Sequence, residues 1–195
     1  MSKYAIIDLE MCRLPKDKWT IFNYKTEIIQ IGAVLVDENL EIVDSFMTLV
    51  KPQYGTIDDY IEKLTGIKQK DVSNAPSFEK AIELFTDWLP NDVEIVSWSE
   101  TDADQIIAEL DGKEIYNDKM EDLLDTWIDC QYTFGEKMNN PDRSYKLSEA
   151  LNIADIYYNE GEHDALIDAK NTALLFIKMK KETVLQISPY IINSI

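Results

Sequence analysis

Two acidic side chains lie at the end of a short apolar run near the start of the sequence. The run covers residues 4–9 and contains Asp8, and Glu10 follows it directly, two positions after Asp8. In a strand, side chains alternate between faces, so both carboxylates would share a face, with Cα atoms about 6.6 Å apart. Like charges this close either raise a pKa or bind a cation, and carboxylate oxygens favour Mg²⁺ or Mn²⁺. The alternative is a strand that ends at Leu9 and leaves both acids in solvent.

The only histidine of the sequence, His163, is followed five positions later by Asp168. Five helical positions rotate by about 140°, so the two side chains would not share a face within one helix. Asp164 is a suitable N-cap, which would place His163 just before a helix and Asp168 one turn inside it. Both side chains could then approach a common point. A surface histidine without a chemical role is the alternative interpretation.

A third acidic segment comes directly after an apolar run over residues 93–98. It contains Asp102 and Asp104 in the sequence SETDAD. Ser99 with Asp102, and Thr101 with Asp104, both have the spacing of a capping box, so either aspartate could serve only to begin a helix. The spacing alone does not distinguish the two.

The hydrophobic pattern predicts strands and helices that could position these acids. The strand-like runs cover residues 4–9, 28–36, 42–50, 93–98 and 127–132. The predicted helices cover residues 78–89, 102–110, 147–151 and 164–179, and residues 56–72 form a polar segment. Strands come early and alternate with helices later, which favours a mixed sheet with helices packed on it.

The composition predicts one domain over residues 1–195. No linker or repeat divides the sequence, and 19 basic against 37 acidic residues give a net charge of −18. This charge argues against a protein that coats nucleic acid or anionic membranes by bulk attraction. The sequence shows neither a secretory signal nor an apolar run long enough for a membrane span, so we expect a cytoplasmic protein with reduced Cys12 and Cys130. The apolar segment at residues 182–195 is expected to pack on the domain or on a second subunit.

In their order along the chain, the three acidic motifs resemble those of a known enzyme family. The segments IIDLE, WSETD and HDALIDA resemble the three exonuclease motifs of the DnaQ-like, DEDDh 3′-to-5′ exonucleases. Between them, EIIQIGAVLVD resembles the second strand of the family, and FMTLVKP followed by LTGIKQKDVSNAPSF favours the Eri/KapD-like exoribonuclease branch. The resemblance implies an α/β protein with a ribonuclease H-like fold, in which helices flank a mixed five-stranded sheet.

The resemblance also implies roles for particular residues. Those that match the metal-binding acids are Asp8, Glu10, Asp102 and Asp168. His163 matches the general base, and Asp102 is preferred over Asp104 because Trp98 and Asp102 have the spacing typical of the family. The positions that match contacts to the terminal nucleotide are the backbone of Met11 and Thr65.

The implied chemistry is phosphodiester hydrolysis. Two Mg²⁺ or Mn²⁺ ions about 3.5 to 4 Å apart can stabilise the negative charge that develops on the phosphate. A histidine with a reference pKa near 6.5 can accept a proton from the attacking water at neutral pH. The family comparison therefore implies a 3′-to-5′ exonuclease that acts on 3′ ends of single-stranded RNA and releases 5′-mononucleotides.

Other functions remain open from the sequence. DNA is the alternative substrate, and a catalytically idle ribonuclease H-like module that binds a protein partner is the alternative function. The intact set of five residues argues against the idle module. An acidic cation-binding protein is a further class, but the sequence lacks the Asp-x-Asp-x-Asp-Gly loop that would support it. Neither the oligomeric state nor the choice between RNA and DNA follows from the sequence.

Overall fold

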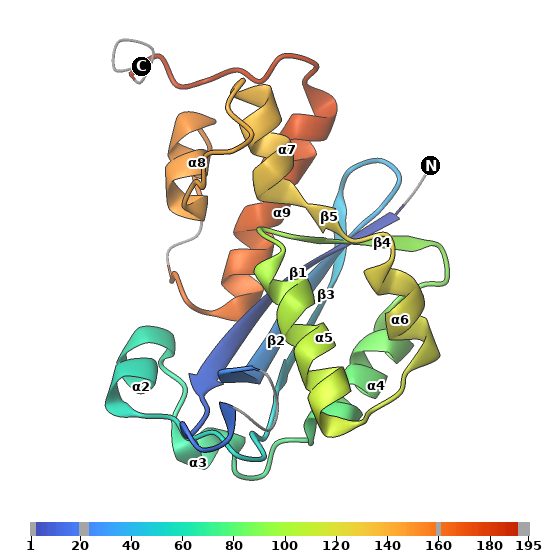
Figure 1. Cartoon of the computed structure of the whole chain (residues 1–195). Helices are drawn as coiled ribbons and strands as arrows, with labels where there is room; N and C mark the ends of the chain where they lie inside the picture. Colours follow the sequence, from blue (N-terminus) through green and yellow to red (C-terminus); the bar gives the residue numbers. More distant parts are fainter. Residues whose placement is uncertain (1–2, 20–23, 159–160, 191–195) are drawn as a thin grey trace.

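A five-stranded sheet forms the centre of the molecule (Figure 1). The computed structural model describes residues 3–19, 24–158 and 161–190. The strands are β1 (Lys3–Arg13), β2 (Thr26–Val36), β3 (Ile42–Leu49), β4 (Val93–Ser97) and β5 (Ile128–Asp129). They lie in the order β3-β2-β1-β4-β5; β1, β2 and β3 pair in antiparallel fashion, whereas β4 is parallel to β1 and to β5. The expected mixed five-stranded sheet is confirmed.

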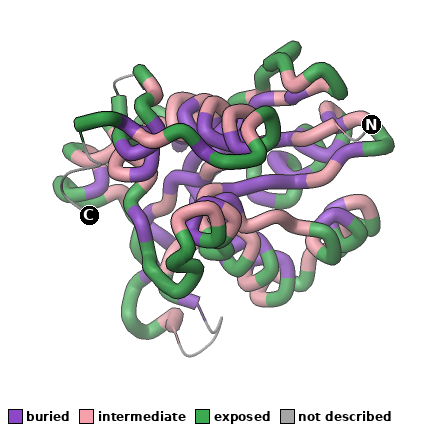
Figure 2. The backbone as a smooth tube through the Cα atoms, turned by 90° about the horizontal axis from the view of Figure 1, so that it is seen from above, coloured by how far each residue is buried: buried purple, intermediate pink, exposed green. Residues whose placement is uncertain are grey.

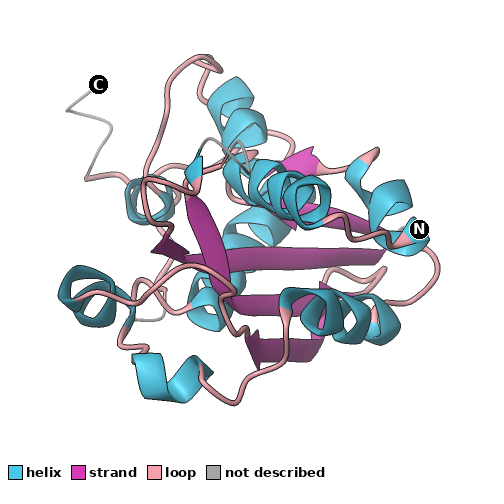
Figure 3. Ribbon diagram, turned by 60° about the horizontal axis from the view of Figure 1, so that its bottom comes forward, coloured by secondary structure: helices cyan, strands magenta, loops and turns pink. Residues whose placement is uncertain are grey.

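Helices cover both faces of this sheet (Figure 3). They are α2 (Asp59–Thr65), α3 (Gln69–Val72), α4 (Phe78–Trp88), α5 (Thr101–Lys113), α6 (Asp118–Leu124), α7 (Cys130–Lys137), α8 (Leu147–Ile153) and α9 (Ala165–Lys181). Residues of α4, α5 and α6 form one half of the core, and residues of α7, α8 and α9 form the other. The buried positions follow the strands and the inner sides of the helices (Figure 2).

Strand β1 separates the two halves of the core by its alternating side chains. Ala5, Ile7 and Leu9 are buried against the α4 side, whereas Ile6 is buried against the α9 side. The strand does not end at Leu9 but continues to Arg13, with a bulge in the β1–β2 ladder between Glu10 and Met11. The alternative of a strand that ends before the second acid is therefore wrong.

Two of the sequence predictions need correction at the level of elements. The predicted strand over residues 127–132 has only two strand residues, because the Asp129 side chain accepts a hydrogen bond from the Tyr132 backbone nitrogen at 2.7 Å and begins α7 there. The segment over residues 56–72, predicted only as a polar segment, contains α2 and α3. Its buried residues, Ile61, Ile67 and Val72, form a small separate cluster.

A buried ionic network fixes the loop that follows β3. The Glu27 carboxylate accepts hydrogen bonds from the backbone nitrogens of Gln53 and Tyr54, at 3.0 and 2.8 Å. Lys113 lies 2.9 Å from Glu27 and 2.6 Å from Glu109, and both carboxylates are fully buried. One ammonium group therefore bridges two carboxylates that belong to different elements.

The segment after α9 packs on the domain as far as it is described. Leu185 is buried in the core half formed by α7, α8 and α9, and the Ser188 backbone nitrogen donates to the Ile153 oxygen at 2.7 Å. Residues 191–195, the end of the predicted apolar segment, lie outside the described residues. No helix within the described residues combines the length and the apolar composition that crossing a bilayer requires.

Candidate active site

Asp8 and Glu10 lie on the face of β1 that α9 covers. Glu10 is only 8% exposed, and burial together with the charges of Asp168 and Asp102 raises its pKa to about 8. The pKa of Asp8 is also raised, first by burial and then by the same two neighbouring carboxylates. Burial is the main cause of both shifts, so the alternative of two solvated acids is wrong for this pair.

Asp102 joins this pair from the first turn of α5. It is buried, and burial raises its pKa to about 7, although a hydrogen bond from the Leu9 backbone acts in the opposite direction. Asp104 is exposed on the same turn, where its backbone nitrogen donates to the Glu100 oxygen at 3.0 Å. The structure therefore brings Asp102, and not Asp104, to the acids of β1.

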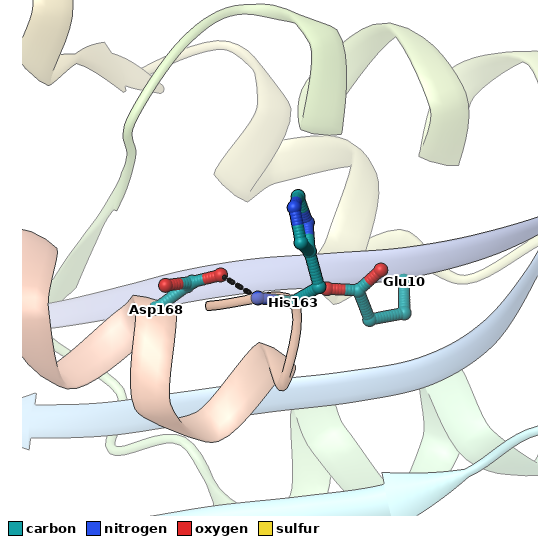
Figure 4. A group of neighbouring side chains, drawn as sticks. All are labelled: Glu10, His163 and Asp168. Atoms are coloured by element: carbon teal, nitrogen blue, oxygen red, sulfur yellow. Dashed lines mark hydrogen bonds between the residues drawn. The ribbon is translucent and has the colours of Figure 1, made fainter. Parts of the chain in front are cut away.

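His163 and Asp168 reach the same place from the beginning of α9 (Figure 4). Asp164 is the N-cap, since its side chain accepts from the Ile167 backbone nitrogen at 3.1 Å, and His163 precedes the helix as expected. The His163 backbone nitrogen donates to Asp168 Oδ2 at 2.8 Å, in a turn with a left-handed φ of 69°. One ligand atom from each of Glu10, His163 and Asp168 lies within 4.8 Å of the other two.

Two residues of β2 hold the first turn of α9 against the acids. Gln30 pairs with Glu10 in the sheet, and its side-chain oxygen accepts from the Ala165 backbone nitrogen at 3.1 Å. Gly32 pairs with Asp8, and its lack of a side chain lets the backbone of Leu166 approach the sheet closely. The sequence analysis missed both, although a glutamine and a glycine inside an apolar strand are the signal that could have shown them.

Met11 and Thr65 do not belong to the acidic cluster itself. Met11 follows the bulge after Glu10, and Thr65 is the last residue of α2. The Thr65 hydroxyl donates to the Ile61 oxygen at 2.9 Å and accepts from the Ile67 nitrogen at 3.1 Å, so it helps to end the helix. Contact of these two residues with a terminal nucleotide stays a prediction.

A cavity of about 430 Å³ opens beside the acids. Asp8, His163 and Asp168 contribute to its lining, together with residues of α8 and its flanking segments. We refer to it as the α8 cavity. The other residues that line it are Trp98, Lys146, Leu147, Ser148, Leu151, Tyr158, Glu162 and Asn171. Two of the four acids, Asp8 and Asp168, therefore border a cavity that a ligand can enter.

The donor set fits hard divalent cations. Asp8, Glu10, Asp102 and Asp168 supply carboxylate oxygens, and burial raises the pKa of all four. Within the described residues no lysine or arginine forms an ion pair with any of these carboxylates. Mutual repulsion without a basic partner is relieved either by protons or by bound cations, and oxygen ligands of this kind suit Mg²⁺ and Mn²⁺.

Comparison with known proteins identifies the family. Residues 5–176 match the Exonuclease family RNase_T, so the chain belongs to this family and is an exonuclease domain. A DNA polymerase III PolC-type from Caldanaerobacter subterraneus subsp. tengcongensis is 30% identical over 91% of this chain and 12% of its own length. Human ERI1 exoribonuclease 2 is 28% identical over 82% of this chain and 26% of its own length. The chain thus matches a limited part of these longer relatives.

Other relatives match over most of both chains. The DNA polymerase III subunit epsilon of Aquifex aeolicus is 28% identical over 92% of this chain and 81% of its own length. The fold is that of the nuclease domain of 3′hExo, a DEDDh family member bound to rAMP, with a TM-score of 0.79 at 23% identity and 96% coverage of both chains. The resemblance to DnaQ-like DEDDh exonucleases and the ribonuclease H-like fold are thereby confirmed, and the family's need for divalent metal agrees with the acidic and histidine cluster.

Proposed function

We propose that this exonuclease removes 5′-mononucleotides from the 3′ ends of single-stranded RNA, with two Mg²⁺ or Mn²⁺ ions. The observation that carries the proposal is the convergence of acids from β1, α5 and α9 beside one histidine. Several relatives are named as exoribonucleases, and the structure with the same fold was bound to rAMP. These names support RNA as the substrate.

In this proposal, backbone pairing and backbone hydrogen bonds hold the four carboxylates in place. Asp8 and Glu10 are held by the ladder to β2, Asp102 by the Leu9 backbone, and Asp168 by the His163 backbone. Each carboxylate would keep its oxygens in place while a phosphodiester binds, so little free energy would be needed to reorganise the site during the reaction. The divalent ions supply positive charge where negative charge develops on the phosphate.

His163 is the proposed general base. It is exposed, and its backbone is tied to Asp168, so the imidazole is held at the edge of the acidic cluster while remaining accessible to water. Imidazole exchanges protons readily near neutral pH, whereas carboxylates committed to cations do not. His163 would accept the proton of the attacking water, and the 3′ oxygen of the preceding nucleotide would leave.

DNA is the second candidate substrate, because the relatives also include the DNA polymerase III subunit epsilon and a PolC-type polymerase. A catalytically idle module that binds a protein partner is the alternative from a different functional class. The cytoplasm remains the proposed compartment, on the ground that the two thiols, Cys12 and Cys130, are free and buried.

The proposal is tested with single-stranded RNA and DNA of the same sequence, each labelled at the 5′ end. With Mg²⁺ or Mn²⁺ we expect a ladder that shortens from the 3′ end, faster for RNA, and no ladder in EDTA. The matched control is Asp8→Asn, which should leave both strands intact. Uncleaved RNA and DNA in both metals would refute an active exonuclease, and faster cleavage of DNA would refute the substrate preference.

A further inference from the structure

The α8 cavity contains one cationic side chain within its described lining, Lys146. It lies on the side formed by α8, whereas Asp8 and Asp168 belong to the sheet and to α9. Lys146 is exposed, and its ammonium group forms no ion pair or hydrogen bond with any residue that the structure describes. In a chain of net charge −18, this cation beside the acids is available to an anionic ligand that enters the cavity.

The backbone that carries Lys146 is firmly held. The Trp98 indole nitrogen donates to the Tyr145 backbone oxygen at 3.1 Å, and the Tyr145 side chain is buried against Phe134 in an edge-to-face contact at 5.1 Å. The Lys146 oxygen accepts from the Ala150 nitrogen at 3.0 Å in the first turn of α8. The ammonium group therefore extends from a fixed point at the cavity, which reduces the entropy lost when it binds a ligand.

The position of Lys146 relative to the acids indicates which phosphate it could bind. Its ammonium group lies outside ion-pair distance of every described carboxylate, so it does not neutralise the acids that would hold the cations at the scissile phosphate. In an enzyme that releases 5′-mononucleotides from a 3′ end, the terminal nucleotide contributes only the scissile phosphate. Any second phosphate within reach must therefore come from the 5′ side of the cut.

We propose that Lys146 binds the phosphate immediately on the 5′ side of the nucleotide that precedes the terminal one. The inference rests on the proposed function and deepens it, because it assigns part of the α8 cavity to the retained strand rather than to the released nucleotide. Lysine is a common ligand of single phosphates, as a compact charge with freely rotating donors.

The experiment compares two minimal RNA substrates. The dinucleoside monophosphate ApA has only the scissile phosphate, whereas pApA carries one additional phosphate on the 5′ side. For Lys146→Met we expect kcat/KM to fall about tenfold on pApA and to remain near the wild-type value on ApA. The reason is that only pApA carries the phosphate whose charge-assisted contact with Lys146 is lost. Lys146→Arg keeps the positive charge, so its kcat/KM values on pApA and on ApA should both remain close to those of the wild type.

Lys70→Met is the matched control, because Lys70 is exposed on α3 and its removal changes the net charge by the same amount. It should affect neither substrate. An equal loss on ApA and pApA, or no loss on either, in an enzyme whose wild type cleaves both would overturn the role of Lys146 alone. A wild type that cleaves neither these substrates nor longer RNA and DNA would instead overturn the proposed function.

Discussion

Gly32 on β2 lies directly opposite Asp8 on β1, and the absence of a side chain at Gly32 allows α9 to approach the sheet there. A Cβ atom at this position would lie 2.2 Å from the Leu166 nitrogen and 2.3 Å from the Ala165 carbonyl carbon. Backbone atoms cannot move aside as a flexible side chain can. The distance between the acids of β1 and Asp168 on α9 therefore depends on a glycine that binds nothing itself.

Gly32→Ala should displace the first turn of α9. We expect a loss of about 3 kcal/mol in the free energy of unfolding, the upper part of the usual range for overpacking, and a weaker affinity for Mn²⁺. Denaturant unfolding and calorimetric Mn²⁺ titration measure the two effects. The control is Ile82→Val, which removes one methylene from the other half of the core and should cost about 1 kcal/mol with unchanged Mn²⁺ affinity. A variant that matches wild type in both measurements would contradict the role of Gly32.

Asp102 and Asp104 should differ sharply despite their proximity in sequence. Asp102→Asn removes a buried charge from the cluster and should lower both Mn²⁺ affinity and RNA cleavage by at least tenfold. Asp104→Asn changes an exposed side chain and should leave both within about twofold of wild type. The same calorimetric titration and cleavage assay apply to both variants, and equal losses would contradict the assignment of Asp102.

His163→Ala should separate cation binding from turnover. We expect Mn²⁺ affinity to be retained and kcat to fall by about 10²- to 10⁴-fold, the usual contribution of a general base. Asp8→Ala should lose both, because Asp8 belongs to the carboxylate set. Wild-type turnover in the His163 variant would refute the base assignment, and a parallel loss of Mn²⁺ affinity would show that the imidazole is a ligand.

The cation-free protein should become less stable as the pH rises. The pKa of Glu10 is raised to about 8 and that of Asp102 to about 7, from ordinary values of 4.5 and 3.8. The folded state therefore binds more protons than the unfolded state, and its free energy of unfolding falls as the pH rises from about 4 to about 8.

Thermal unfolding in EDTA at several pH values measures this effect. Added Mg²⁺ should raise the melting temperature most at pH 8, since cations then replace the lost protons. In Asp102→Asn the decrease between pH 5 and pH 7 should be smaller. A melting temperature in EDTA that rises with pH over this interval would contradict the raised pKa values.

Lys113 should be essential for stability rather than for chemistry. Lys113→Met leaves the carboxylates of Glu27 and Glu109 buried without their shared cation, and should cost about 3 to 5 kcal/mol in the free energy of unfolding. Lys80→Met, which removes an exposed ion pair with Glu83, should change the free energy of unfolding much less, because water already screens that pair. Chemical denaturation of the two variants under one buffer condition makes the comparison, and similar costs would contradict the importance of burial.

The sequence predicted the parts of the fold that depend on local pattern. The apolar runs located the long strands, and the alternation along β1 correctly placed Asp8 and Glu10 on one face. The extension of β1 to Arg13 was missed, because it depends on pairing with β2 across the bulge. Short helices such as α6 and α7 were missed as well, since a helix of seven or eight residues has little periodicity to detect.

In the candidate site, too, the sequence predicted the local features but not the contacts between distant segments. Spacing and family resemblance selected the acids and His163, and the structure places Asp8, Glu10, Asp102 and Asp168 as electrostatic neighbours. The residues that hold them there were not predicted, because Gln30 meets Ala165 across 135 positions of sequence. The network of Glu27, Glu109 and Lys113 likewise arises only when distant segments pack together.

The side of α9 that faces the sheet limits which amino-acid substitutions the chain can accept. Ala165, Ala169 and Ala173 recur at every fourth position and are fully buried, so α9 places only methyl groups in the interior at these three positions. Any larger residue at these positions would lift the helix and carry Asp168 away from the acids of β1. Side-chain volume at these three positions thus sets the spacing between α9 and β1, and even one additional methyl group there should weaken cation binding before it unfolds the domain.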